Sequence, residues 1–163
     1  MAYQRLQVSE GLAVIPSDTV PIPDPSTEVT SGTADFSVAG TLTDVGTTFL
    51  SAGIQTNAIV YNVTAGIAYY VTAVTNDLNL ALSPSSAGGA TDEYVIYNAA
   101  TKACTLYVGV GPAAVVVQMA SQRDAANSDT VTFENVPSSA FLPILVTRVA
   151  STGTVASKII ALW

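Results

Sequence analysis

The sequence predicts an all-β protein: an antiparallel β-sandwich or barrel built from the N-terminal arm and the C-terminal half, with a small β module inserted between them. The chain is rich in Val, Thr and Tyr, which fit the pleated, half-buried surface of a sheet. Short apolar or alternating runs recur along it, separated by Gly, Pro, Asn and Ser in the manner of turns. Its 163 residues suffice for one domain or two small ones.

Residues 1–26 are the first of three blocks and end in a proline-rich stretch. Its prolines are Pro16, Pro21, Pro23 and Pro25. Prolines at this density are incompatible with a helix or a central strand. Val20 and Ile22 alternate with them, and a flexible linker has no need of such apolar side chains. We therefore expect an ordered, extended arm that lies across another surface.

Residues 27–98 are the second block, the inserted module. Asp44 is placed to cap a short helix over Val45–Ala52, with Gly53 as its stop and with Phe49 and Leu50 facing the core. Strand-like runs follow at Ala58–Val63, Ile67–Val74, Leu78–Leu82 and Glu93–Tyr97. In the run Leu78–Leu82, Leu alternates with other residues with period two, as expected of a half-buried strand. We expect a compact antiparallel barrel or meander of four or five strands.

Residues 99–163 are the third block, which we expect to complete one β-domain with residues 1–26. Its strand-like runs are Thr105–Gly109, Ala113–Met119, Thr130–Glu134, Phe141–Val149 and Ser157–Trp163. Strands at this spacing, with Gly, Pro and Asn turns, favour a sandwich or barrel. Because the chain ends on a large aromatic side chain, Trp163, we expect the C-terminus to be packed as a strand of the sheet.

The composition argues against most enzyme classes. The chain has no His and a single Cys. This excludes Ser-His-Asp and Cys-His catalysis, His metal sites, an intrachain disulfide and Cys-rich zinc sites. Charged residues are 10% of the chain against about 25% in an average domain. Low charge fits a surface largely covered by partner subunits, where charged residues are depleted.

The few charges are unevenly placed. No Lys or Arg lies between Leu6 and Thr101, a stretch that holds nine of the 12 acidic residues, whereas the chain from Lys102 onward is close to neutral. The acidic part would repel phosphates, which argues against binding of nucleic acid. The N-terminus lacks the apolar stretch of a signal peptide and no run is long enough to span a bilayer, so we expect synthesis in a cytoplasm.

Few residues suggest chemistry of their own. Asp124 and Asp129 flank a polar loop, where carboxylates are usually solvated, and Asp92 with Glu93 offers too few oxygens for calcium unless others converge. Gly109-Val110-Gly111 follows a strand but has no third Gly and no helix after it, so it predicts a turn and not a nucleotide-binding loop. We expect Cys104 to be a small buried hydrophobe.

The seven Tyr leave two interpretations open. They could form a platform that binds sugars, or they could pack in the core. Most of them alternate with apolar positions in strand-like runs, which favours packing.

Segments at both ends of the chain resemble one family of virion proteins. The N-terminal segment is Leu12-Ala13-Val14-Ile15-Pro16-Ser17-Asp18-Thr19, followed by Pro21 and Pro23. The C-terminal segments are Leu106–Gly111, Thr130–Pro137, Leu142–Val149 and Ser151–Trp163. In this order they are similar to the head spike base proteins of tailed bacteriophages and gene transfer agents. Residues 27–98 depart from the compact members of that family and look like a small β module of phage structural proteins.

The resemblance implies a non-enzymatic virion protein without a cofactor, docked on the capsid exterior as a homo-oligomer after synthesis in the host bacterial cytoplasm. It would be a cement or decoration protein, or a head spike base, that stabilises the shell or anchors a spike. The implied partners are the major capsid protein, copies of itself in a trimer or pentamer, and a spike fibre protein, with no nucleic acid or membrane. The first and third blocks would contact the shell while the second projects.

Candidate contacts with the capsid or with neighbouring subunits follow from the arm and the C-terminal block. These residues are Pro16, Val20, Pro21, Ile22, Pro23, Pro25, Arg148 and Trp163. Two other functions remain open at this stage. One is a tail or baseplate component, or an adhesin that binds host glycans through an exposed Tyr cluster. The other is a hydrolase, which would need carboxylates that converge in a cleft.

Overall fold

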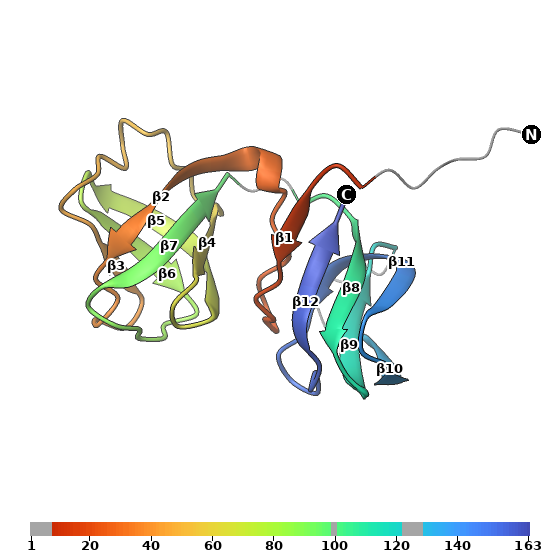
Figure 1. Ribbon diagram of the computed structural model, residues 1–163. Helices are drawn as coiled ribbons and strands as arrows, with labels where there is room; N and C mark the ends of the chain where they lie inside the picture. The colour runs from red at the N-terminus through yellow and green to blue at the C-terminus, as the bar shows by residue number, and fades with distance from the viewer. Residues whose placement is uncertain (1–7, 99–100, 122–128) are drawn as a thin grey trace, which may run out of the picture.

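The computed structural model describes residues 8–98, 101–121 and 129–163, and within them the regular structure is almost entirely β (Figure 1). The first six strands are β1 (Gly11–Ala13), β2 (Glu28–Ala34), β3 (Thr41–Thr43), β4 (Ile59–Asn62), β5 (Ile67–Asn76) and β6 (Asn79–Ser83). The others are β7 (Asp92–Tyr97), β8 (Cys104–Val110), β9 (Ala113–Met119), β10 (Val131–Val136), β11 (Ala140–Val149) and β12 (Ser157–Leu162). One 3-10 turn, η1, spans Pro25–Thr27. The predicted all-β class is confirmed.

The two ends of the chain meet in one antiparallel sheet, which we call the terminal sheet. Its strand order is β1-β12-β8-β11-β9-β10. β11 is the long strand between β8 and β9. Ala140–Leu142 and Val146 pair with β8, and Val146, Arg148 and Val149 pair with β9. The register shifts in both ladders, and such irregularities bend a strand. The terminal domain therefore encloses its own core, with Leu106, Val108 and Val117 at its centre.

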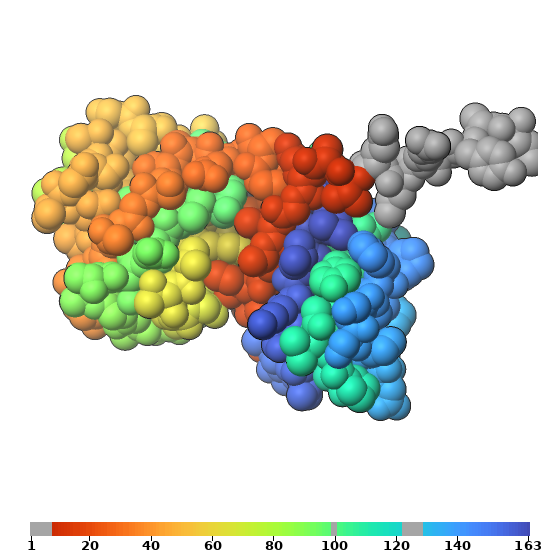
Figure 2. Space-filling model, viewed as in Figure 1, coloured from red at the N-terminus to blue at the C-terminus, as the bar shows by residue number. Residues whose placement is uncertain are grey.

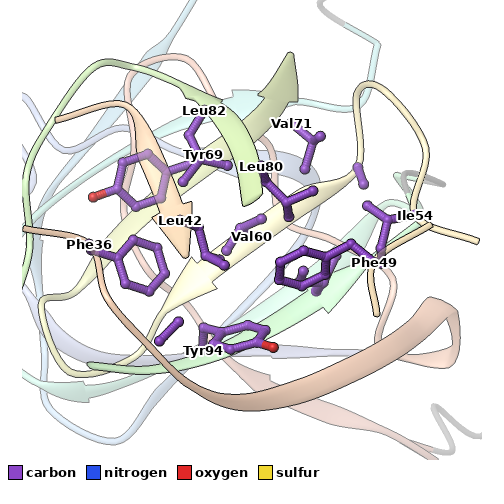
Figure 3. Packing of buried hydrophobic residues seen from close by; sticks show 13 residues of the cluster. Phe36, Leu42, Phe49, Ile54, Val60, Tyr69, Val71, Leu80, Leu82 and Tyr94 are labelled. Carbon is purple, nitrogen blue, oxygen red and sulfur yellow. The ribbon is translucent and has the colours of Figure 1, made fainter. Parts of the chain in front are cut away.

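The inserted module is a second sheet that curls into a small barrel. Its six antiparallel strands follow the order β2-β7-β4-β5-β6-β3. Asp35, just beyond β2, exchanges two backbone hydrogen bonds of 2.8 and 2.9 Å with Thr43 of β3, so the outer strands meet. Figure 3 shows the side chains that fill the interior, among them Phe36, Tyr69 and Tyr94. Closure in this way protects the edge strands.

The prediction of a helix over Val45–Ala52 is wrong, because the segment forms a series of turns. The Asp44 carboxylate does not begin a helix: it accepts hydrogen bonds from the Gly46 N–H and the Tyr94 hydroxyl, each at 2.7 Å. The next amides bond to the neighbouring β5–β6 turn, where the Phe49 N–H donates to the Asp77 carbonyl at 2.9 Å. Phe49 faces the core as predicted, but Leu50 is 58% exposed.

No helix among the described residues has the length and apolar character needed to cross a membrane.

The strands of the terminal sheet come from residues 11–13 and 104–162, and those of the module from residues 28–97. The module is thus a continuous insertion between two parts of one sheet.

Phe49 and Leu50 provide a matched test of the turn-rich segment. Phe49→Ala should lower the free energy of unfolding of the module by about 3–5 kcal/mol, because it removes a fully buried ring. Leu50→Ala should change it by less than about 0.5 kcal/mol, because that side chain is exposed. Chemical denaturation measures both, and equal losses for the two variants would contradict the observed orientation.

Candidate functional site

The proline-rich arm lies between the terminal domain and the module and contacts both. Val20 is buried in a cluster with Ile59, Tyr61 and Tyr97 of the module. Two residues later, Ile22 is buried in the core of the terminal domain. Both side chains are only 2% exposed. The arm is therefore an ordered part of the chain that links the terminal core to an apolar cluster on the module, separate from the module's own core.

Hydrogen bonds fix the course of the arm along the terminal sheet. The amides of Ser17 and Ile22 donate to the carbonyls of Val149 and Thr147 at 2.9 and 2.8 Å. The Asp18 carboxylate accepts from the backbone amide and the hydroxyl of Thr152 at 2.8 and 2.7 Å. Partial burial works against the charge of Asp18, but the hydrogen bonds from Thr152 and Ser151 outweigh it, so the pKa of Asp18 is lowered. These contacts tie the arm to the turn before β12.

A capped 3-10 turn then directs the chain from the arm into the module. The buried Asp24 side chain accepts hydrogen bonds from the Ser26 N–H at 3.0 Å and the Ser26 hydroxyl at 2.7 Å. Pro25 occupies the first position of η1, where the missing N–H costs no hydrogen bond. The module leaves beside its entry, because the Asn98 N–H donates to the Thr27 carbonyl at 3.0 Å.

None of the eight residues predicted to touch a capsid or a neighbouring subunit is freely exposed. Val20, Ile22, Pro23 and Arg148 are buried, and Pro16, Pro21, Pro25 and Trp163 are half-buried. Arg148 on β11 lies close enough to the module to act on Tyr70 of β5. Burial raises the pKa of Tyr70, and the positive charge of Arg148 opposes that rise. The Trp163 indole donates to the Lys102 carbonyl at 3.1 Å, and its side chain packs against the terminal core. Val20, Ile22, Pro23 and Arg148 are thus covered by their own chain, whereas the other four keep part of their surface exposed.

The carboxylates considered for catalysis or calcium binding form no cluster among the residues that the structure describes. Asp124 lies outside the described residues, and Asp129 and Glu93 are exposed. Asp92 is buried, where its carboxylate accepts from the Asn62 amide and the Gly89 N–H at 2.7 Å each. The described part of the chain contains no group of three or more His, Cys, Asp or Glu side chains placed to hold a metal ion.

The described tyrosines are mostly packing residues. Tyr61, Tyr69, Tyr94 and Tyr97 are buried, and Tyr70 and Tyr107 are half-buried. Tyr61 and Tyr97 meet edge to face at 5.8 Å in the cluster that receives Val20. Tyr3 lies outside the described residues. Within the described ranges the Tyr side chains therefore form no exposed platform for a sugar.

The turn after β8 requires glycine at two positions, Gly109 and Gly111, because the neighbouring chain approaches closely there. At Gly111 a Cβ would meet the Val136 carbonyl oxygen and the backbone of Pro137, so no larger residue fits. Gly109 lies equally close to Lys158, which has a positive φ of 54° on the neighbouring strand β12. The predicted turn is present, although β11 lies between the two strands that it connects. The close approaches leave no cradle for a phosphate.

One side of the terminal sheet carries an apolar face, which we call the outer face. It consists of Tyr107, Phe141, Leu145, Ile160 and Leu162. These alternate with residues of the terminal core, so they point to the opposite side of β8, β11 and β12. Phe141 and Leu145 are 62% and 57% exposed, and the rings of Tyr107 and Phe141 lie 5.1 Å apart. Figure 2 shows these three strands side by side at the surface.

Two lysines lie beside the outer face. The face continues into a hollow of about 220 Å³ lined by Leu145, Leu162, Trp163 and the exposed Lys102. At the other end Lys158 stands over Gly109. Among the described residues that point outward from β1, β12, β8 and β11, none is acidic. The sequence signal for this face is the run Phe141–Val149, apolar on both sides of the strand, which is typical of a strand covered on both faces.

A smaller apolar surface with acidic neighbours lies on the module, and we call it the tip patch. It consists of Val45, Leu50 and Leu78, which are 84%, 58% and 39% exposed, together with Asp44 and Asp77. The Asp44 N–H donates to the Leu78 carbonyl at 2.9 Å, and the Leu50 N–H donates to the Asp77 carboxylate at 3.2 Å. These bonds bring the turn-rich segment and the β5–β6 turn together.

Comparison with known proteins finds no relative: no protein-family model, curated protein or solved structure matches the chain. The features that remain are the arm between the two domains and two apolar surfaces with opposite charges beside them.

Ile22 and Thr19 provide a test of the arm. Ile22→Ala should lower the free energy of unfolding by about 2–5 kcal/mol, because the side chain fills the terminal core. Thr19→Ala, in the same arm but exposed, should leave it nearly unchanged. Denaturation curves followed by Trp163 fluorescence provide the comparison. Two variants of equal stability would mean that the arm is not packed as described.

Cys104 is predicted to be unreactive in the native protein. It is 1% exposed, and burial raises the pKa of its thiol to about 12. At pH 8 the thiolate fraction is then on the order of one in ten thousand. A disulfide reagent should therefore label native protein only as fast as it unfolds, and denatured protein at once. Rapid labelling of the native protein would contradict the buried position.

Proposed function

We propose that this protein is a non-enzymatic structural protein of a virion, bound as a homo-oligomer to the outside of a capsid. The observation that supports this best concerns the segments that resemble head spike base proteins. They come from both ends of the chain, yet the arm, β8, β10, β11 and β12 assemble into one domain. Proteins that share the function of one folded unit are expected to resemble each other within that unit.

The module fits this role as an addition to the terminal domain. Its two ends lie side by side, since Glu28 pairs with Tyr97 and Asn98 bonds to Thr27. An insertion whose ends are adjacent leaves the surrounding fold intact. In this proposal the module points away from the shell, where it can contact a spike fibre or a neighbouring copy. Apart from the buried Asp92, its acidic residues are exposed or half-buried, and like charge at the surface keeps particles apart.

The terminal domain supplies the contact with the major capsid protein and with neighbouring copies. Its outer face exposes Phe141 and Leu145, and exposed apolar patches can mark interaction sites. Cement between capsomers and a spike base at a vertex are both compatible with this arrangement.

Binding to empty shells tests the proposed function. Full-length protein is mixed with shells assembled from the major capsid protein of the same phage or gene transfer agent. We expect saturable co-sedimentation and cryo-EM density on the outer surface, with no binding to shells already decorated with the protein. Tails of the same particle serve as the second binding partner. Binding to tails alone, or to neither, would overturn the proposal.

A further inference from the structure

We infer that copies of this chain assemble head to tail, with the tip patch of one copy docked on the outer face of the next. This inference rests on the proposed homo-oligomer and names its interface. The tip patch is Val45, Leu50 and Leu78 with Asp44 and Asp77. The outer face is Tyr107, Phe141, Leu145, Ile160 and Leu162, with Lys102 and Lys158 beside it. The occupant of the outer face is therefore a second copy of the same protein.

Symmetry requires two different surfaces for a trimer or a pentamer. A ring of three or five copies is held by contacts in which one patch on each subunit meets another patch on the next. A patch that meets its own copy on a second subunit produces only pairs. The chain carries two separate apolar patches, one on each domain, as a ring needs.

The charges of the two patches are complementary. Lys102 and Lys158 lie beside the outer face, and the described residues that point outward from it include no acid. Asp44 and Asp77 lie within the tip patch, and no Lys or Arg is found anywhere in the module. Docking of two outer faces would bring only positive charges together, and docking of two tips only negative ones. The pairing of a tip with an outer face is the one that brings opposite charges together.

The two patches lie on different parts of the molecule. The chain between β3 and β4, which carries Val45 and Leu50, lies on the side of the module away from the terminal domain (Figure 1). The arm holds the two domains together through Val20 and Ile22, so one copy does not fold back on its own outer face. The tip of each copy is therefore available to another.

The exposed side chains also suit an interface. Phe141 and Leu145 of the outer face, and Val45 and Leu50 of the tip patch, are each more than half exposed in the single chain. Burial of such side chains supplies most of the favourable free energy of association. Lysines at the margin then set the orientation more than the affinity.

Two blocked variants test the head-to-tail arrangement without any capsid. Leu50→Glu blocks the tip, and Phe141→Glu blocks the outer face. We expect analytical ultracentrifugation to find a ring for the wild type and monomers for each variant alone. A mixture of the two variants should contain dimers with one copy of each, because only one tip and one outer face remain intact. Val38→Glu and Val155→Glu, at exposed valines outside both patches, should still form the ring.

Each other result overturns the inference. A wild type that stays monomeric, a blocked variant that still forms rings, or a mixture without mixed dimers would each exclude the tip–face contact. Circular dichroism checks that all variants are folded. This outcome is independent of binding to shells. Rings that do not bind shells would refute the proposed function, whereas monomers that bind shells would refute the head-to-tail contact.

Discussion

The whole architecture depends on the short arm in which Val20 enters one apolar cluster and Ile22 another. Val20 packs with Ile59, Tyr61 and Tyr97 of the module, and Ile22 fills the terminal core. Pro21 between them restricts the backbone, which lowers the entropy lost when the arm becomes ordered. Leu12 and Ile15 pack against the same cluster, so the N-terminal segment contacts the module at several residues. The arm thus sets the direction in which the module points.

Polar contacts give the arm its path, and apolar contacts hold it there. Asp18 binds the turn before β12, and Asp24 caps the 3-10 turn that leads into the module. The remaining apolar surface is divided between the outer face and the tip patch. A rigid link between domains that carry such surfaces allows one copy to present its tip at a fixed distance from its outer face. That is the condition for a closed ring in place of irregular association.

The sequence predicted the strands from β4 to β12, because alternation and Gly or Pro turns are local signals, but it did not predict β1, β2 or β3. It failed at Val45–Ala52, where the apparent N-cap Asp44 forms instead a hydrogen bond with Tyr94, a partner 50 positions away. Val20, Ile22 and Arg148 were assigned to contacts between proteins but are buried within the chain. The sequence pattern indicates that a side chain is buried. It does not indicate whether the same chain or another chain buries it. The outer face was missed for the converse reason, since the run Phe141–Val149 suits a strand buried on both sides.

Hydrogen exchange at the amides of the arm tests the central claim most directly. The Ser17 and Ile22 amides donate to Val149 and Thr147, while the Val20 amide donates to the Ser17 hydroxyl at 3.0 Å. If the arm is an integral part of the terminal domain, these amides exchange as slowly as that of Leu106 in the centre of β8, since opening them requires unfolding of the domain. Exchange of Ser17 and Ile22 as fast as exposed loop amides, with Leu106 still protected, would show that the arm detaches and that the two domains are not held together by it.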